Sequence, residues 1–290
     1  MDRIAFLNEL AELLDWRALI YLCLTLSLIV IAKTVNNLTS GYNLNRELTI
    51  QDNKAVATSF TGFLFALYII LYAVLTSEST SEGVRADLKE TALWAELACV
   101  LLISARIISD KVLLPKFSNR KELVHDRNIG VGAVQAGSYI STALIIKGLM
   151  MYETNHSVLV DIGYTTGWFI LAQALFIVFA FFYQKGAKFC IHTELERDNA
   201  AVGVAFGGNL IAFSIILAFY LQYYNNILGL CIWALIAVIF LKLVRLITDK
   251  VILPKGCLDQ ELSLDNNWGA ALIEAVTSIG AALILTGSLF

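Results

Sequence analysis

The sequence predicts an all-α, polytopic integral membrane protein, and three observations support this fold class. Hydrophobic residues make up 58% of the 290 residues and charged residues only 16%, with a mean hydropathy of +0.71, which is outside the range of soluble domains. The apolar runs are unbroken rather than alternating, which argues against a lipid-exposed barrel of strands. The longest uncharged run, residues 200–241, is twice the roughly 20 residues that one spanning helix needs. Its polar middle, residues 222–226, therefore predicts the turn of a helical hairpin.

The remaining apolar runs, taken in the same way, bring the predicted number of membrane spans to eight. Their ranges are 18–34, 55–76, 91–109, 129–150, 163–184, 200–221, 227–246 and 268–289. Before the first span, Ile4, Leu7, Leu10 and Leu14 fall on one helical face of an acidic segment. Residues 1–16 therefore predict a helix that lies on the outer membrane surface rather than a cleaved signal peptide.

The basic residues orient these spans, because Lys and Arg accumulate in short cytoplasmic loops. Of the 21 Lys and Arg residues, 16 lie in or beside the segments that follow the odd-numbered spans. A loop on the opposite side is acidic, with Glu78, Glu82, Asp87 and Glu90. We therefore expect a multi-pass membrane protein with both termini facing away from the cytoplasm and the lipid bilayer as its first partner.

The eight spans form four copies of a two-span hairpin. In each odd-numbered span a Trp is followed 17 residues later by a Lys: Trp16 and Lys33, Trp94 and Lys111, Trp168 and Lys185, Trp233 and Lys250. This spacing is about 25 Å of helix, which places Trp at the outer interface and Lys at the inner one. Because all four hairpins have the same orientation, they are parallel repeats related by an axis along the membrane normal.

Each even-numbered span begins with an Asn that has an acidic residue just before it. The Asn residues are Asn53, Asn128, Asn199 and Asn267, and the acidic residues are Asp52, Asp126, Asp198 and Asp265. One interpretation is helix capping, at about 1 kcal/mol for each cap. The other is a ring of polar side chains around a cytoplasmic vestibule that attracts cations. Small residues four and eight positions after each Asn predict close packing between these helices.

Two octapeptides, SDKVLLPK at residues 109–116 and TDKVILPK at residues 248–255, contain both prolines of the chain. Proline lacks an N–H and disfavours helix before it, so the two helices should end near Leu114 and Leu253. The octapeptides make the second and fourth hairpins the most alike. The chain therefore divides into two four-helix units, residues 1–158, which include the N-terminal interfacial helix, and residues 159–290.

A family resemblance follows from how the even-numbered spans begin. Asn128-Ile-Gly-Val-Gly132 and Asn199-Ala-Ala-Val-Gly203 open spans in paired hairpins, and this pattern resembles the YjfL-like bacterial membrane proteins, or domain of unknown function 350. The resemblance implies four helices for each unit and covers nearly the whole chain as two units in tandem. The first hairpin departs from the pattern, because Asn53-Lys-Ala-Val-Ala57 lacks the glycines. The resemblance implies a membrane fold and a location in the bacterial inner membrane, so that the termini are expected in the periplasm, but it implies no activity.

Two arginines, Arg106 and Arg245, lie 12 residues beyond the outer Trp of their spans, which places them in the inner third of the membrane. Each has an acidic residue four positions on, Asp110 or Asp249, on the same helix face. One interpretation is an arginine that reaches towards the interface with this Asp as its counter-ion. In the other interpretation, the arginine crosses to the neighbouring even-numbered span.

Glu274 lies two helical turns inside the last span, and Gln135 is its equivalent in the second hairpin. A carboxylate within a span faces the bundle interior and is a functional candidate by default. An ion or small-solute channel or transporter would use Glu274 and Gln135 with Arg106 and Arg245. The main alternative is a structural pair between Glu274 and Arg245.

Three function classes remain: an ion or small-solute pathway, a scaffold and an intramembrane enzyme. The pathway is disfavoured by the prolines, because both lie outside the predicted spans and these spans therefore lack the broken helices typical of transporter sites. The basic loop 109–128 would suit a scaffold that binds anionic lipid or a soluble cytoplasmic partner. An enzyme is not expected, because the spans hold no His cluster or Ser-Lys dyad.

The five scattered cysteines form no C-x-x-C pair, so neither a metal site nor a cofactor is expected. We expect a stress-associated scaffold or channel-like protein, a homo-oligomer in its assembly and no nucleic acid among its partners, with the channel or transporter as the alternative.

Overall fold

The computed structural model describes residues 16–77, 83–113, 118–152 and 157–289. Every regular element within these ranges is helical, with twelve α-helices and one π-helical turn. This confirms the predicted fold class. Residues 1–15 of the predicted interfacial helix lie outside the described residues.

Eight helices of the described chain are long and apolar enough to cross a membrane, as predicted. They are α2 (Trp16–Ser40), α4 (Lys54–Thr76), α5 (Val84–Val112), α7 (Ile129–Met150), α8 (Val158–Gly186), α10 (Ala200–Tyr223), α11 (Ile227–Ile247) with the π-helical turn η1 (Thr248–Ile252), and α13 (Trp268–Gly287). Between the two long helices of each hairpin lies a short helix: α3 (Leu44–Thr49), α6 (Asn119–Val124), α9 (Ile191–Glu196) and α12 (Leu258–Ser263). Each repeat is therefore a long helix, a short helix and a second long helix.

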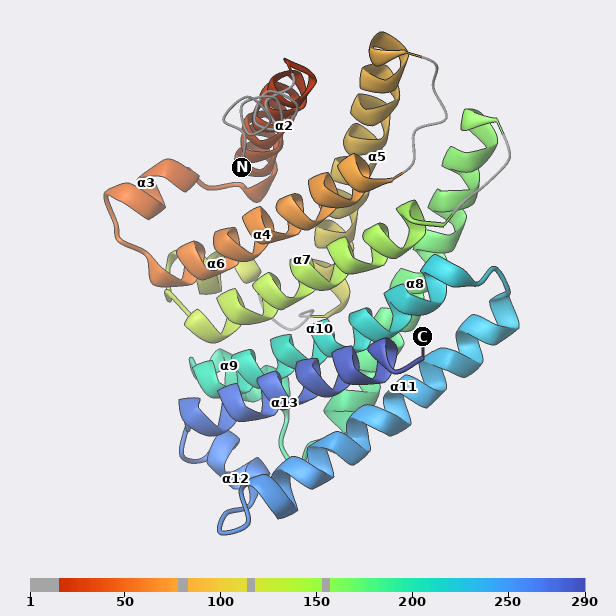
Figure 1. Ribbon diagram of the computed structural model, residues 1–290. Helices are drawn as coiled ribbons and strands as arrows, with labels where there is room; N and C mark the ends of the chain where they lie inside the picture. The colour runs from red at the N-terminus through yellow and green to blue at the C-terminus, as the bar shows by residue number, and fades with distance from the viewer. Residues whose placement is uncertain (1–15, 78–82, 114–117, 153–156, 290) are drawn as a thin grey trace, which may run out of the picture.

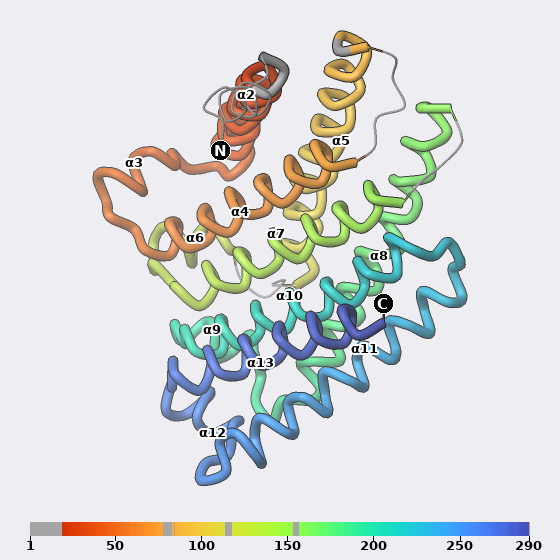
Figure 2. The backbone as a smooth tube through the Cα atoms, in the orientation of Figure 1, coloured from red at the N-terminus to blue at the C-terminus, as the bar shows by residue number. Residues whose placement is uncertain are grey.

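The second long helices of the four repeats stand side by side in one layer, in the order α4, α7, α10 and α13 (Figure 1). The helices α5, α8 and α11 pack against this layer, and α2 packs chiefly against α5. Figure 2 shows the colour passing from orange to blue across the layer, so the repeats follow one another in chain order. The two predicted units thus share one continuous layer, joined where α7 meets α10.

Glycines let the helices of this layer approach closely, and each junction uses the same register. A Cβ atom added to Gly62 would lie 2.3 Å from Ala136 Cα, and one added to Gly208 would lie 2.3 Å from Ala275 Cβ. At the central junction the corresponding distance is 2.6 Å, from Gly137 to Gly207 Cα. Each glycine lies nine positions after its capping Asn, and its partner lies eight positions after the next one. Close packing through small residues is confirmed.

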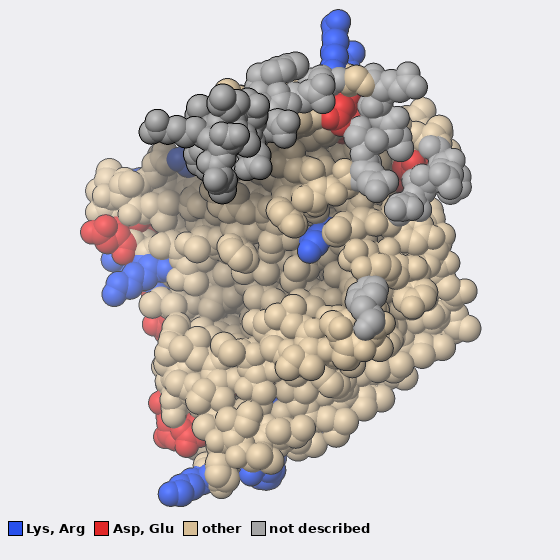
Figure 3. Space-filling view, viewed as in Figure 1, with Lys and Arg blue, Asp and Glu red and all other residues tan. Residues whose placement is uncertain are grey.

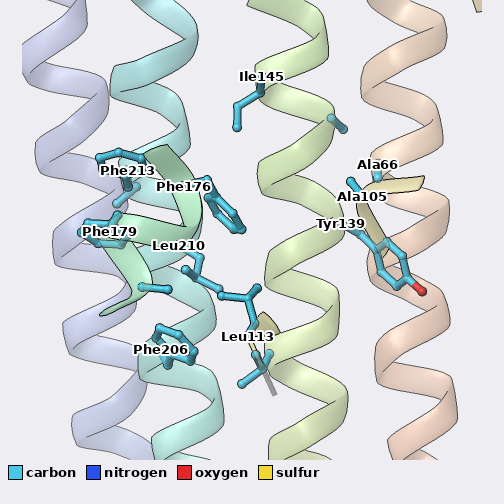
Figure 4. Close-up of a cluster of buried hydrophobic side chains, with 14 of the residues drawn as sticks. Ala66, Ala105, Leu113, Tyr139, Ile145, Phe176, Phe179, Phe206, Leu210 and Phe213 are labelled. Atoms are coloured by element: carbon cyan, nitrogen blue, oxygen red, sulfur yellow. The ribbon is translucent and has the colours of Figure 1, made fainter. Parts of the chain in front are cut away.

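The hydrophobic core lies between the layer and the helices behind it (Figure 4). Phe176 and Phe179 of α8 face α10, and the rings of Phe179 and Phe213 stack with centroids 4.3 Å apart. The outer surface is also largely apolar. Figure 3 shows most Lys, Arg, Asp and Glu side chains of one face near its rims, with a broad surface of other residues between them. This distribution suits a protein surrounded by lipid.

Candidate functional site

All four predicted Asn residues cap their helices. The side-chain oxygen of each accepts a hydrogen bond from backbone N–H groups in the first turn of the long helix that follows: Asn53 from Ala55 and Val56, Asn128 from Val131, Asn199 from Val202, and Asn267 from Ala270. The structure therefore shows the capping arrangement. Each cap satisfies donors that the start of a helix leaves free.

The amide groups of the same Asn side chains make further bonds. Each donates to a Glu on the short helix of its own repeat, at 2.7–3.2 Å: Asn53 to Glu47, Asn128 to Glu122, Asn199 to Glu194, and Asn267 to Glu261. The first three also donate to a Leu carbonyl of the next repeat: Asn53 to Leu123, Asn128 to Leu195, and Asn199 to Leu262. The caps therefore join each repeat to the next.

The residue immediately before each Asn adopts a left-handed backbone conformation. The φ angles of Asp52, Arg127, Asp198 and Asn266 lie between 46° and 58°. Two of these side chains accept a hydrogen bond from the preceding repeat: Asp198 from Ile129 N at 3.2 Å, and Asn266 from Ala201 N at 3.0 Å. This is a second contact between repeats at the helix starts.

The predicted acidic residues occupy different positions around the caps. Burial raises the pKa of Asp198, whereas a hydrogen bond from His125 lowers the pKa of Asp126, which also pairs with Lys121 at 3.2 Å. Asp265 lies two positions before Asn267 and is exposed. The described chain places the four caps along an open row, because α4 and α13 lie at opposite edges of the layer (Figure 1). Within one chain they are therefore a row rather than the expected ring.

The acidic residue of each octapeptide holds the start of the next short helix. Asp110 Oδ1 accepts from Asn119 Nδ2 at 2.7 Å, and Asp249 Oδ1 accepts from Leu258 N at 2.7 Å. Helix α5 ends at Val112, and the π-helical turn that follows α11 ends at Ile252, with Leu253 as its cap. The predicted end near Leu253 is confirmed, whereas Leu114 lies outside the described residues.

The other two repeats hold their short helices in the same way. Asn37 Oδ1 accepts from Leu44 N at 2.8 Å, and Gln184 Oε1 accepts from Ile191 N at 2.8 Å. Sequence analysis missed Asn37 and Gln184, although both are polar residues near the end of an odd-numbered span, seven positions before the short helix.

Glu274 is the centre of a polar cluster in the second half, and its side chain is fully buried. Its Oε1 atom accepts hydrogen bonds from Tyr183 Oη (2.9 Å), Asn209 Nδ2 (3.1 Å) and Arg245 Nε (2.9 Å). Its Oε2 atom has no hydrogen-bond partner among the described residues. Sequence analysis missed Tyr183 and Asn209, and the only available signal was that Asn209 is a polar residue within a span.

Arg245 crosses from α11 to the neighbouring helix, as one of the two interpretations expected. It forms ion pairs with Glu274 at 2.9 Å and with Asp259 on α12 at 2.8 Å. Its guanidinium group also lies over the ring of Tyr183, 5.3 Å from the centroid. The alternative pairing with Asp249 is not formed, because Asp249 binds Leu258 and pairs with Lys250 at 2.8 Å.

The equivalent cluster of the first half has different bonds. Arg106 Nη1 donates to Asn36 Oδ1 on α2. Asp110 Oδ1 accepts from Gln135 Nε2 at 2.9 Å, and Gln135 Oε1 accepts from Ser59 Oγ at 2.7 Å. Among the described residues, no ion pair within 4.0 Å joins Arg106 to Asp110. Arg106 is therefore bound by a neutral amide where Arg245 is bound by two carboxylates.

The space beside the cluster of the first half is small. A cavity of about 10 Å³ lies beside Arg106, Asp110, Gln135 and Tyr139, which is room for about one water molecule. Within the described chain, no group of three His, Cys, Asp or Glu side chains could hold a metal ion. The site therefore consists of two buried polar clusters and a row of helix caps.

Comparisons with known proteins agree with this architecture. The model of the family Domain of Unknown Function (DUF350) matches residues 6–150 and 157–289. A relative described as a UPF0719 transmembrane protein, from Aquifex aeolicus (strain VF5), is 19% identical over 247 residues, and the match covers 83% of this chain and 88% of the relative. No solved structure matches. The predicted resemblance is confirmed, and the chain belongs to the domain of unknown function 350 family as a multi-pass membrane protein with two family units in tandem.

Proposed function

We propose that the protein is a structural scaffold of the bacterial inner membrane rather than a conduit for solutes. The observation that carries this proposal is the closed environment of Glu274. Its Oε1 atom receives three hydrogen bonds, and its side chain is inaccessible to solvent. A pathway residue would instead border a water-filled space or an unwound helix segment.

The position of a hollow on the surface supports the same conclusion. A shallow groove of about 620 Å³ lies on the surface between α4 and α7 and is lined largely by apolar residues such as Phe65, Ile129 and Ile140. It does not include Glu274, Gln135 or either arginine of the two clusters. The charged side chains of the two clusters therefore do not line this hollow.

One observation favours a second candidate function, an ion or proton pathway. Glu274 Oε2 is buried and has no hydrogen-bond partner among the described residues, and such an oxygen is a position for a proton or a water molecule. In this alternative, Glu274 would change its protonation state during transport and Arg245 would be its counter-ion.

Flux measurements separate the two functions. Purified protein in liposomes, loaded with a pH-sensitive dye under a potassium gradient, should give no more proton or potassium flux than empty liposomes, while an added ionophore gives full flux. Flux above the empty liposomes that disappears in Glu274→Gln would overturn the scaffold proposal in favour of the pathway.

The scaffold proposal includes an orientation. The bias of basic residues places the short helices α3, α6, α9 and α12 in the cytoplasm and both termini in the periplasm. A reporter that is active only in the periplasm should therefore work after Phe290 and fail at Asn119, and the reverse pattern would refute this orientation. The basic loop between α5 and α7 is the proposed docking surface for anionic lipid or a soluble partner. The association with stress stays a prediction.

A further inference from the structure

We propose that copies of this chain associate head to tail, with the last repeat of one copy docked on the first repeat of the next as if the row of repeats continued. This inference goes beyond the scaffold function and stands on the geometry of the repeats alone. The three junctions within the chain share a register of small residues and a bond from an Asn cap to a Leu carbonyl, and each edge of the row carries one half of both contacts.

The helix faces at the two edges correspond to those of the internal junctions. Within the chain, the position nine residues after one cap packs on the position eight residues after the next, as in Gly208 on Ala275. At the end of the row the first of these positions is Val276, which is 66% exposed. At the start of the row the second is Thr61, which is also exposed. The two helix faces are therefore open and match in register.

The row of Asn caps is likewise incomplete at its end. The first three caps each donate to a Leu carbonyl of the next repeat, but Asn267 is exposed and its amide donates only to Glu261 of its own repeat among the described residues. The carbonyl that the series predicts as its acceptor is Leu48 O in the first repeat. No hydrogen bond from the described part of the chain occupies this oxygen. A second copy supplies the missing acceptor.

The contact that precedes the caps gives a third match. Asp198 accepts from the backbone N–H of Ile129, the residue directly after the cap of the preceding repeat. Asp52, the corresponding residue of the first repeat, is exposed and makes no described hydrogen bond. The matching N–H at the end of the row is that of Trp268, the first residue of α13, whereas the cap Asn267 accepts from Ala270 N. Asp52 of one copy is thus placed to accept from Trp268 of another.

The membrane allows this association because all four repeats are parallel, so adding another copy keeps the same side of the protein in the cytoplasm. The contact is heterologous: a row of copies closes into a ring if the rotation between copies permits and otherwise extends. Val276 replaces the glycine of the internal junctions. Two copies therefore stand farther apart than two repeats of one chain, and their contact is the weaker one.

Disulfide trapping in native membranes tests the proposal. In a chain whose five cysteines are replaced by Ser, Asp52→Cys is made in one tagged copy and Trp268→Cys in a second copy with another tag. Both residues are exposed at the helix starts, where a thiolate forms readily. The matched control is Asp198→Cys with Ile129→Cys in one chain, which tests the equivalent contact within a copy.

Mild oxidation should join the two tagged copies when they are expressed together and leave each single variant monomeric. The control should form its disulfide within one chain, detected by mass spectrometry after alkylation. Crosslinks within either single variant would indicate a two-fold dimer and overturn the proposal. Absence of the mixed crosslink, with the control disulfide formed, would overturn it as well.

Discussion

Arg106 and Arg245 occupy the same position in the two halves of the chain, yet their surroundings differ. Arg245 joins Glu274 and Asp259 at 2.9 and 2.8 Å, whereas Arg106 donates to the neutral side chain of Asn36. The difference follows from two positions, because the first half has uncharged Gln135 in place of Glu274 and Arg120 in place of Asp259. The two carboxylates thus accompany a change in the partner of the arginine.

The framework that holds these clusters is nevertheless common to both halves. Asp110 and Asp249 each fix the start of a short helix through a 2.7 Å hydrogen bond, which accounts for the repeated octapeptide. The halves therefore share their loops and caps and differ in the charge of their buried clusters. This comparison predicts how equivalent substitutions should diverge.

The largest divergence should come from removing the arginines. Arg245→Met leaves two carboxylates without their ion pair, so it should lower the free energy of unfolding by about 3 kcal/mol. Arg106→Met loses a bond to a neutral amide and should cost about 1 kcal/mol. Unfolding in mixed micelles of increasing denaturing detergent, followed by circular dichroism, measures both. Equal losses of stability in the two variants would contradict the proposed difference between the two arginine sites.

The caps should show the next largest difference. Asn199→Leu removes a helix cap and the bond to Leu262, so it should cost about 2 kcal/mol. Asn267→Leu removes a cap without an inter-repeat bond in the chain and should cost about 1 kcal/mol in monomeric protein. Thermal unfolding in detergent compares the two variants. Asn199→Asp should also destabilise, since a carboxylate would face Glu194, and its tolerance would reduce the role of Asn199 to capping alone.

A carboxylate placed in the cluster of the first half should lower the stability of the protein. Gln135→Glu replaces the amide that donates to Asp110 at 2.9 Å with a second carboxylate, so it should lower stability by about 1 to 2 kcal/mol. Adding Asp110→Asn should recover most of this loss, because an amide again faces a carboxylate. Unfolding midpoints are compared for the unchanged chain, the two single variants and the double variant. A double variant no more stable than Gln135→Glu would contradict the explanation.

The smallest effect is expected at Asp198, whose equivalent in the fourth repeat is the neutral Asn266. Burial raises the pKa of Asp198 above its ordinary value of 3.8, so the folded state binds the proton more tightly than the unfolded state. Asp198→Asn should therefore stabilise at pH 7 by less than about 1 kcal/mol. This gain should shrink as pH falls through the folded pKa. Melting temperatures of both proteins are measured from pH 4 to 7. A stabilisation by Asp198→Asn that increases as pH falls would contradict this prediction.

Much of the fold could be predicted because its signals are local. Hydropathy gives the spans, an Asn before each even-numbered span gives the caps, and small residues give the close faces. The angle between neighbouring repeats depends on tertiary packing and not on residue spacing. The sequence therefore allows a ring of caps, whereas the structure has an open row. The sequence allows two partners for Arg245, one on its own helix and one on the neighbouring span. Residues distant in the sequence decide between them, because Glu274 and Asp259 bind Arg245 while Leu258 N binds Asp249.

The partners of Glu274 depend on the same tertiary register. Tyr183 and Asn209 come from α8 and α10, and nothing in their own segments marks them as ligands of a carboxylate 65 or more positions away. Glu274 itself could be identified because a charge within a span is rare. The sequence thus locates the centre of the cluster, and the packing of three helices supplies its surroundings.

The most direct test of the contrast between the halves is a pair of double-mutant cycles measured by unfolding in mixed micelles. Glu274→Gln with Arg245→Met should give a coupling energy of about 2 kcal/mol, because the two side chains form a buried ion pair. Gln135→Leu with Arg106→Met should give less than about 0.5 kcal/mol. Coupling near zero between Glu274 and Arg245, in variants that stay folded, would contradict the structural role assigned to this pair.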